Sequence, residues 1–466
     1  ASATQYTLPQ ILLRQSEMLG SEAPAIREKA YGIWQTYSWL DYYRYVKYTG
    51  LGLSNTGLKR GENVGIVTDN MPEWLFCEIG CQSIGSVTLN LFTSSVPEEL
   101  CHALNRIKAA CVIAQNQEQV DKLIEMRERL PHVRRVIYID PTGMRTYRAN
   151  PWLVSFSDLL ELGERLDHEY PDLFLKELQK GRRDSVAIMI QTSGTTGISK
   201  LAMLSHRNIT EMARNWIESI PITSGDNWIS ISPPAWIVDQ MCSVGVALAG
   251  GMTVNFPEMP DTIPEDFREI GPSIIITSSR FWEDLASRIM VKMDDAGFIR
   301  RKLFSMSIEI GKKVVELQAK GEDVPGHLDL LRRISSCGIY RPLLDRVGCS
   351  GIKNAFTGGH PISPDVIHFF RALGLNLKQC YGLTEAGGIF QIQPDSEVKL
   401  QSVGKPLPRT LVQIADDQEV LVQSDANFVG YYNDFRATEE AFSSGWLKTR
   451  DAGYIDKDGH LVIIER

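Results

Sequence analysis

The residues best suited to chemistry lie in the stretch Thr192-Ser-Gly-Thr-Thr-Gly-Ile-Ser-Lys200, which carries two Gly, three Thr, two Ser and one Lys. The glycines allow the backbone to adopt positive φ and to approach a ligand closely. The hydroxyls and the lysine can donate hydrogen bonds to phosphate oxygens. An apolar run from Val186 to Ile190 has the length of a buried strand, and a helical pattern from Asn208 to Ile217 follows the loop. We therefore predict a strand, a phosphate loop and a helix, an arrangement that binds nucleotide phosphates.

This loop differs from a Walker A motif. Gly194 and Gly197 are too close together for the pattern G-x-x-x-x-G-K, and Lys200 is followed by Leu201 rather than by Ser or Thr. An ordinary surface loop is the alternative, because Gly, Ser and Thr are common in turns. The concentration of hydroxyls beside a lysine favours a phosphate loop of another type.

Two later stretches could supply a ring platform and a metal ligand. Thr357-Gly-Gly-His-Pro361 follows an apolar strand, and its paired glycines would let a flat ring lie against bare backbone. In Tyr381-Gly-Leu-Thr-Glu385, the tyrosine can stack on a ring and Thr384 can donate to a phosphate. Glu385 can bind Mg²⁺ through oxygen. The alternative for this second stretch is a turn with a surface carboxylate.

A third stretch, from Gly445 to Gly459, contains a carboxylate suited to a ribose. Asp451 could accept hydrogen bonds from both ribose hydroxyls. The same stretch ends in Asp458-Gly459, which predicts a β-hairpin, and the two interpretations are compatible.

The rest of the chain must position these groups. Strand and helix patterns alternate from about residue 60 to 140, which predicts a parallel sheet covered on both faces. A second α/β stretch runs to about residue 400 and includes a charged helical excursion over residues 298–333. Short strands and turns dominate from Val403. We predict an α/β fold with two helix-flanked, mainly parallel sheets and a small β-rich subdomain, divided into residues 1–183, 184–402 and 403–466.

Bulk properties narrow the class of function. The chain has 466 residues and a net charge of −8, which argues against nucleic acid as a partner. No apolar run reaches transmembrane length and no signal peptide is visible at the N-terminus. The eight cysteines are scattered without a zinc-binding pattern, so we expect reduced thiols in a cytoplasmic protein.

Together these motifs resemble those of the adenylate-forming superfamily, which contains acyl-CoA synthetases, luciferases and peptide-synthetase adenylation domains. The resemblance covers essentially the whole chain. Residues 192–200, extended by Leu204-Ser-His206, resemble the family's phosphate loop, and residues 357–361 resemble its adenine-side motif. Residues 381–385 are similar to its most characteristic motif. Asp451 matches the ribose-binding aspartate, and Arg466 matches the arginine at the end of the large domain.

Within the superfamily, the chain is most similar to bacterial-type long-chain fatty acyl-CoA synthetases. Residues 272–283 resemble the segment that lines the acyl tunnel in those enzymes, and Trp236 falls where they place a bulky gating residue. The helical excursion is also typical of this branch.

The resemblance implies that ATP activates a fatty acid to acyl-AMP, which CoA then converts to a thioester with release of AMP. It implies catalytic roles for Thr384, Glu385 and Lys200, and Mg²⁺ bound by Ser193 and Glu385. The acyl substrate would contact Trp236 and Gly382. The residues implied to bind the nucleotide are Thr192, Ser193, Gly194, Thr195, Thr196, Gly197, Lys200, Gly358, Gly359, His360, Gln379, Tyr381, Gly382, Thr384, Asp451 and Arg466. Peripheral membrane contact and a homodimer are both compatible with this assignment.

The chain departs from the family pattern at four positions, which are Ser199, Leu201, Arg450 and Glu465. The first stands in place of Pro and the next two in place of Gly, and we expect Leu201 to add bulk near the loop. The family's mobile C-terminal domain, of roughly 100 residues, is expected to lie outside this chain. Two alternatives remain open, namely a fatty acyl-AMP ligase that loads a carrier protein and a non-catalytic relative that binds nucleotide or fatty acid.

Overall fold

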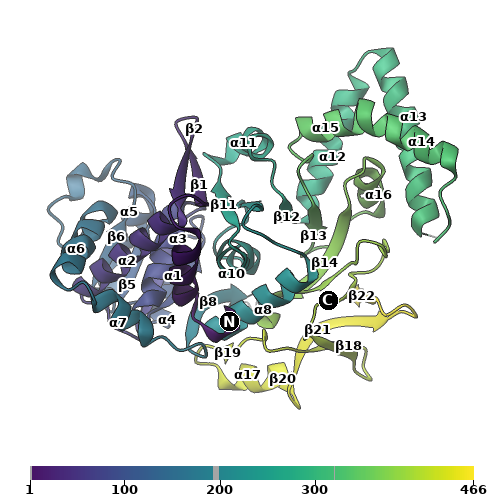
Figure 1. Cartoon of the computed structure of the whole chain (residues 1–466). Helices are drawn as coiled ribbons and strands as arrows, with labels where there is room; N and C mark the ends of the chain where they lie inside the picture. The colour runs from purple at the N-terminus through teal and green to yellow at the C-terminus, as the bar shows by residue number, and fades with distance from the viewer. Residues whose placement is uncertain (1–2, 193–198, 320, 466) are drawn as a thin grey trace. The chain divides into compact units, whose positions relative to one another are not determined.

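The computed structural model describes residues 3–192, 199–319 and 321–465. The chain forms two compact units that interleave in sequence (Figure 1). The first unit contains Ala1–Gly225, Ser230–Phe256 and Asp425–Glu440, and the second contains Asp226–Ile229, Pro257–Ser424 and Ala441–Arg466. These units therefore do not coincide with the three consecutive segments expected from the sequence.

The main sheet of the first unit has eight strands in the order β19-β9-β8-β4-β3-β5-β6-β7. The strands from β8 to β7 are parallel, whereas β9 pairs antiparallel with both β8 and β19. The strand bounds are β3 Asn63–Val67, β4 Val87–Leu91, β5 Cys111–Ala114, β6 Arg135–Tyr138, β7 Leu153–Ser155, β8 Val186–Thr192, β9 Lys200–Ser205 and β19 Gly430–Tyr431. The helices that connect or precede them are α2 Trp39–Asn55, α3 Pro72–Ser83, α4 Pro97–Arg106, α5 Gln117–Glu125, α6 Phe156–Glu169 and α7 Leu173–Gln179.

Burial on both faces of this sheet explains the continuous apolar runs of its strands. Val67 and Leu89 are fully buried, and Leu104 of α4 is packed in the same core. Glycine at position 65 has a structural reason, because a Cβ there would lie 2.4 Å from Leu104. The alternation of strands and helices predicted between residues 60 and 140 is thus confirmed.

A strand that the sequence pattern does not indicate follows the phosphate loop. The chain forms β9 before the helix α8 His206–Ser219 begins, so the loop joins two antiparallel strands. Residues Thr192 and Lys200 face each other in this pairing. The helix is capped separately, because Ser205 and Asn208 form a reciprocal capping box at its N-terminus. The helix predicted over residues 208–217 is therefore confirmed as part of α8, but a strand that was not predicted lies between it and the loop.

The first unit also contains the hairpin of β1 and β2, whose neighbour in the sheet, β11, lies far away in the sequence. Strands β1 Pro24–Ala30 and β2 Ile33–Ser38 are antiparallel, and β11 Thr253–Phe256 lies parallel to β1. The remaining helices are α1 Leu8–Leu19, α9 Ile237–Asp239, a π-helix Gln240–Val246 and α10 Ala247–Gly250.

The second unit contributes six strands in the order β16-β15-β14-β13-β12-β10. Strands β10, β12, β13 and β14 run parallel to one another, whereas β15 pairs antiparallel with both β14 and β16. The strand bounds are β10 Asn227–Ile229, β12 Ile274–Thr277, β13 Asn354–Thr357, β14 Leu377–Leu383, β15 Gly388–Ile392 and β16 Lys405–Pro406. The helices are α11 Ile263–Ile270, α12 Ser279–Asp294, α13 Phe298–Ala319, α14 Gly326–Ser335, a π-helix Ser336–Tyr340, α15 Arg341–Arg346 and α16 Pro364–Ala372.

The helical excursion predicted over residues 298–333 is confirmed as α13 and α14. Figure 1 shows both helices projecting beyond strands β12, β13 and β14 of the same unit. Cys337, just after α14, is exposed, whereas the other seven of the eight cysteines are buried. None of the helices in the described part of the chain combines the length and apolarity that crossing a bilayer requires.

A small antiparallel sheet completes the second unit. It contains β17 Leu411–Ile414, β18 Glu419–Gln423, β20 Phe442–Ser443, β21 Trp446–Ile455 and β22 Leu461–Glu465. Helix α17 Phe435–Ala441 precedes β20. The predicted hairpin is present between β21 and β22, where Gly459 has φ 82°. The expected fold class, with two mainly parallel sheets and a small β-rich part, is confirmed.

One histidine of the first unit is held neutral by its environment. His206 is 4% exposed at the start of α8, and its Nδ1 accepts a hydrogen bond of 3.3 Å from the backbone N–H of Leu8. Burial lowers the pKa of His206 to about 3. The imidazole of His206 binds a proton more readily in the unfolded chain than in the folded one. The contribution of the neutral ring to the free energy of unfolding is therefore complete above about pH 6.5 and is lost as the pH falls toward 3.

We predict that His206→Gln reduces the loss of stability on acidification. The difference in free energy of unfolding between the parent and the variant should change by about 1.4 kcal/mol per pH unit between pH 6 and 4. Urea denaturation over this range measures the difference. His102→Gln, at an exposed position, is the control and should show no such slope. Parallel pH profiles for the parent and His206→Gln would contradict the prediction.

Candidate functional site

Two predicted site residues meet in the second unit. Tyr381, on β14, donates a hydrogen bond of 2.5 Å from its Oη to Oδ2 of Asp451, on β21. Asp451 is 3% exposed, and the Tyr381 ring packs edge-on against Phe390 with centroids 5.1 Å apart. A buried carboxylate fixed by a phenol is an oriented acceptor, which is the property required to bind a pair of hydroxyls.

The backbone around Asp451 is also constrained. The Asp451 N–H donates to Oγ1 of Thr449, and that hydroxyl donates to the carbonyl of Val420. Arg450 has φ 64°, and its N–H donates to Oε1 of Glu419. The position therefore requires the left-handed conformation, which explains why a glycine is the ordinary residue before this aspartate.

The glycines of the two motifs have different surroundings. A Cβ at Gly358 would lie 2.8 Å from Sγ of Cys380, and one at Gly382 would lie 2.2 Å from the carbonyl of Gly388. These two glycines are therefore required by close packing within the sheet. Gly359 has φ 83° with no atom within 4 Å of its Cβ position, so it is the member of the pair that leaves open space for a ring. His360, the next residue, is exposed.

The side chain of Gln379 holds a loop. Its Nε2 donates to the carbonyls of Leu400 and Ser402 at 2.7 and 3.2 Å, and its backbone N–H donates to Oε1 of Gln393. In this structure the amide of Gln379 therefore holds the backbone of this loop in place. Its contact with an adenine ring stays a prediction.

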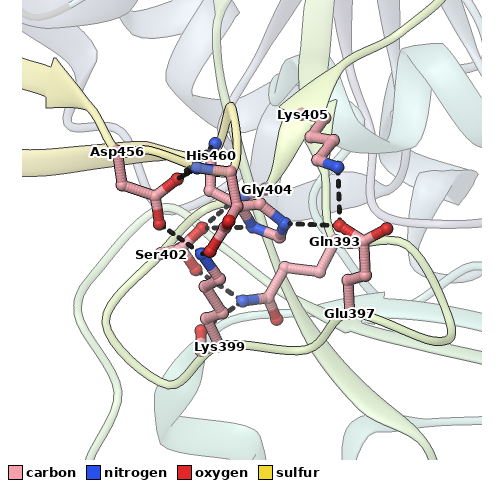
Figure 2. Close-up of polar contacts among 9 residues, drawn as sticks. Gln393, Glu397, Lys399, Ser402, Gly404, Lys405, Asp456 and His460 are labelled. Carbon is pink, nitrogen blue, oxygen red and sulfur yellow. Dashed lines mark hydrogen bonds and ion pairs between the residues drawn. The ribbon is translucent and has the colours of Figure 1, made fainter. Parts of the chain in front are cut away.

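The loop that Gln379 holds contains a second buried network, which Figure 2 shows. Ser402 Oγ lies 3.0 Å from Nδ1 of His460, and Nε2 of His460 lies 3.2 Å from Oε2 of Glu397. Lys405 donates to the same carboxylate at 2.5 Å, and this contact is the main reason that the pKa of Glu397 is lowered.

The contacts from Ser402 to His460 and from His460 to Glu397 resemble those of a hydrolytic triad, but the surroundings of these residues do not suit catalysis. Ser402 is 1% exposed and His460 is 0% exposed, so no substrate could reach the hydroxyl. Ser402 Oγ also accepts from the N–H of Gly404. This network, together with the ion pair between Lys399 and Asp456 at 2.5 Å, fastens the β21–β22 hairpin to the loop. Sequence analysis did not detect it, because the members are separated along the chain and share no motif.

The acidic end of the segment 381–385 lies at a turn. Thr384 and Glu385 form a short 3₁₀ turn directly after β14, and both side chains are half-buried. The following residue, Ala386, is buried and anchors the turn. No cluster of three or more His, Cys, Asp or Glu side chains suited to a metal occurs among the described residues. A single carboxylate at such a turn suits Mg²⁺, which usually retains water and substrate phosphate ligands.

The flanks of the phosphate loop belong to the first unit. Nζ of Lys200 lies 4.8 Å from the ring centroid of Tyr431, and the carbonyl of Ser199 accepts a hydrogen bond from Arg106. Leu201 is fully buried in the core of the first unit's main sheet. The predicted ligands Ser193, Gly194, Thr195, Thr196 and Gly197, and also Arg466, lie outside the described residues, whereas Thr192 ends β8.

Trp236, the predicted acyl-tunnel residue, is 47% exposed immediately before α9 in the first unit. The segment is fixed by Asp239, which is fully buried. Asp239 accepts hydrogen bonds from Nδ2 of Asn70 at 2.5 Å and from Oγ of Ser230 at 2.7 Å.

A second buried carboxylate lies beneath the same segment. Glu78 is fully buried and accepts hydrogen bonds from Trp74 at 2.7 Å, Asn90 at 2.8 Å and Gln240 at 3.0 Å. Burial raises the pKa of Glu78, and the three donors oppose that rise. Because a buried carboxylate is costly unless its oxygens are satisfied, these contacts hold the chain around Trp236 in one position.

The stretch 272–283, which resembles a tunnel-lining segment, forms β12 and the start of α12. Trp282 is fully buried there, and its Nε1 donates to the carbonyl of Phe356 at 3.2 Å. Its ring also contacts Phe370 edge-on at 5.1 Å. Trp282 is therefore a core residue of the second unit.

The two mainly parallel sheets and the small antiparallel sheet define an α/β fold. The model of the AMP-binding enzyme family matches residues 14–432, and the chain belongs to this family.

The chain is similar in sequence to proteins named as long-chain-fatty-acid–CoA ligases. A long-chain-fatty-acid–CoA ligase of Rattus norvegicus is 28% identical over 478 residues, covering 99% of this chain and 64% of that protein. The corresponding ligase named heimdall, of Drosophila melanogaster, is 27% identical, covering 99% of this chain and 69% of that protein. The chain therefore spans about two thirds of the length of these relatives.

Solved structures share the fold. An anthranilate CoA ligase in complex with anthranoyl-AMP superposes with a TM-score of 0.74 at 17% identity, covering 99% of this chain and 77% of that one. The N-terminal domain of FACL13 from Mycobacterium tuberculosis superposes with a TM-score of 0.68 at 17% identity, covering 99% of this chain and 100% of that one.

The left-handed backbone at Arg450 leads to a stability prediction. A left-handed residue with a side chain costs roughly 1–2 kcal/mol, and glycine loses about 0.5–1 kcal/mol through the flexibility of the unfolded chain. We expect Arg450→Gly to raise the free energy of unfolding by up to about 1 kcal/mol and Arg450→Val to lower it by about 1 kcal/mol or more. Urea denaturation measures both changes.

Lys448, on the same strand, is the matched control. It has an ordinary strand backbone, so Lys448→Gly should be the less stable of its two variants and Lys448→Val the more stable. The two positions should thus rank Gly and Val in opposite order. The same ranking at both would show that Arg450 is not under backbone strain.

Proposed function

We propose that this chain is the ATP-binding part of a ligase that activates a long-chain fatty acid to acyl-AMP and then forms a thioester with CoA. The observation that carries the proposal is the hydrogen bond between Tyr381 and Asp451, within a chain of the AMP-binding enzyme family. The names of the relatives support the acyl substrate and the thiol acceptor.

The proposed nucleotide site uses groups of the second unit for the nucleoside. Asp451 would accept hydrogen bonds from the ribose hydroxyls, and Tyr381 keeps that carboxylate oriented. Gly359 leaves open space in which the adenine ring can approach the backbone. A preoriented acceptor needs little reorganisation on binding, so more of the contact energy appears as affinity.

On the phosphate side, the family resemblance assigns roles to Thr384 and Glu385 of the second unit and, separately, to the loop 192–200 of the first. Thr384 would donate to the α-phosphate, and the ammonium group of Lys200 would offset phosphate charge. Glu385 would hold Mg²⁺, an ion that supplies positive charge beside phosphate oxygens. The half-buried carboxylate of Glu385 fits that ion, because its oxygen is a hard ligand at the end of a strand.

In the proposed first step, a fatty acid carboxylate oxygen forms a bond to the α-phosphorus of ATP. The bond from that phosphorus to the bridging oxygen breaks, and pyrophosphate leaves with the electron pair. The reaction brings anions together, so positioning and charge neutralisation supply most of the catalysis. In the second step, the sulfur of CoA forms a bond to the acyl carbon, the bond from that carbon to the phosphate oxygen breaks, AMP leaves with the electron pair, and the thiol proton passes to solvent. Trp236 and Gly382 would contact the acyl chain.

We predict that the protein, in its full natural length, releases pyrophosphate when given ATP, Mg²⁺ and a long-chain fatty acid. A coupled pyrophosphate assay, with orthophosphate measured in parallel, tests the reaction. Orthophosphate as the sole product would instead indicate an ATPase. Adenylate formation without a CoA thioester, but with transfer to a carrier protein, would replace CoA by the carrier as the acceptor.

Substitutions at the ribose site should weaken ATP binding in a graded manner. Asp451→Asn should raise the Kd of ATP by about 10- to 100-fold, because hydrogen bonds to a charged acceptor contribute about 1.5–3 kcal/mol. Tyr381→Phe, which leaves the carboxylate in place but unfixed, should raise it by about 10-fold or less. Calorimetric titration with ATP measures these values.

Tyr454→Phe is the control for these substitutions, since Tyr454 lies on the same strand as Asp451 and is 48% exposed. It should leave the affinity unchanged. If Asp451→Asn also binds ATP as the parent does, Asp451 does not belong to the nucleotide site.

A further inference from the structure

A pocket of about 250 Å³ lies where three helical segments of the second unit meet. Helix α13 is in contact with both α14 and α16 (Figure 1). Helices α13 and α16 approach each other closely, because a Cβ at Gly311 would lie 2.3 Å from the carbonyl of Ala372. Val314 and Val315 of α13 form an apolar wall, and the remaining lining is mostly polar. The pocket thus opens between the projecting helices and the helix that precedes β14.

The guanidinium group of Arg371 lines this pocket without a carboxylate partner. Arg371 lies near the end of α16 and is half-buried. Its side chain forms no ion pair with the described residues, and its hydrogen bond to them is the one that Nη1 donates to Oδ1 of Asn376. Burial lowers the pKa of the Arg371 guanidinium, and the charge of Asp395 opposes that change. Because arginine has five N–H donors, most of those on Arg371 remain for a ligand or water.

The carboxylate of Asp395 is already engaged elsewhere. It is the one acidic group among the described residues that line the pocket. Its Oδ1 accepts hydrogen bonds from Nζ of Lys378 at 2.5 Å and from Nδ2 of Asn376 at 3.0 Å. The side chain of Lys378 is 3% exposed, so Asp395 neutralises a buried ammonium group. The charge of Arg371 is therefore left without a counterion of its own, which is costly for a partly buried group.

Arg332, on α14, brings a second guanidinium group to the same pocket. Its Nε and Nη2 donate to Oδ1 of Asp329 at 3.2 and 2.9 Å, and Arg333 donates to the other oxygen of that carboxylate at 2.8 Å. One carboxylate thus serves two guanidinium groups, and positive charge remains beside the pocket. Ser336, the first residue of the π-helix, adds a hydroxyl donor to the lining. Turns of π-helix are frequent at functional sites.

From these observations we infer that the pocket binds the phosphoryl group of a small anion, such as phosphate or pyrophosphate, between Arg332 and Arg371. A phosphoryl group has three acceptor oxygens and a charge of about −1.5 to −2, so it can accept from two guanidinium groups at once. A carboxylate, in contrast, is saturated by one guanidinium fork. The bound anion joins α14 to α16. None of the lining residues is among those implied to bind ATP, so the inference goes beyond the proposed ligase activity and does not require it.

Hydrogen exchange, measured by mass spectrometry on the protein in its full natural length, tests this inference. Phosphate should slow the exchange of amides in residues 311–318 and 332–340, compared with chloride at the same ionic strength. Because the anion binds only the closed pocket, the rate should fall by the factor 1 + [phosphate]/Kd, which is about 11-fold at a concentration of about ten times Kd. The dependence of the rate on phosphate concentration therefore gives Kd.

Two variants should remove this response. Arg332→Gln/Arg371→Gln lacks both guanidinium groups and should show no slowing by phosphate. If that variant does not fold, Ser336→Asp serves instead, because its added carboxylate would repel the anion and pair with the arginines. Arg300→Gln/Arg301→Gln is the matched control, since it removes the same charge from exposed positions on α13 that do not line the pocket. The control should respond to phosphate as the parent does.

Pyrophosphate is the second probe, because it is the product of the proposed adenylation. The anion with the lower Kd identifies the source of the phosphoryl group that the pocket fits better. Equal exchange rates in phosphate, pyrophosphate and chloride would overturn the inference, as would slowing that persists in Arg332→Gln/Arg371→Gln. These measurements contain neither ATP nor a fatty acid, whereas pyrophosphate release tests the ligase activity. Failure of one proposal is therefore distinguishable from failure of the other.

Discussion

The arrangement of the second unit depends on buried polar contacts between its two sheets. The hydrogen bond from Tyr381 to Asp451 joins β14 of the mixed sheet to β21 of the small one, and the contact of Ser402 with His460 secures the following hairpin. Each of these groups would be costly to bury without its partner. The pairing therefore positions the small sheet more specifically than apolar packing alone could, and it holds the Asp451 carboxylate in one orientation.

Much of the fold could be predicted from the sequence, because its strands and helices have distinct periodicities. Strand β9 was missed because Lys200–Ser205 is short and the helical pattern that follows it is strong. Long-range pairings were not visible either, since β1 and β11 share no local signal that indicates their contact. The interleaving of the two units has the same origin. Segments far apart in sequence complete each unit, and composition does not reveal which segments these are.

For the candidate site too, the sequence indicated single residues but not the contacts between them. The motif around Tyr381 identified a position for chemistry, but not that its hydroxyl orients a carboxylate on another sheet. Of the departures from the family pattern, one has a physical reason and one carries a physical cost. Leu201 fills a core, and Arg450 adopts a left-handed backbone that a glycine would adopt more easily. The glycines at 358 and 382 are equally instructive, because contacts within the sheet require them whether or not a nucleotide is bound.

The distribution of thiols offers an experimental opportunity. Because Cys337 alone among the eight cysteines is exposed, a thiol-reactive fluorophore or spin label should attach at one position without engineering of the chain. That position lies in the π-helix Ser336–Tyr340, which continues from α14. The native protein thus carries its own reporter, whose emission or line shape would respond to a change of polarity around the projecting helices.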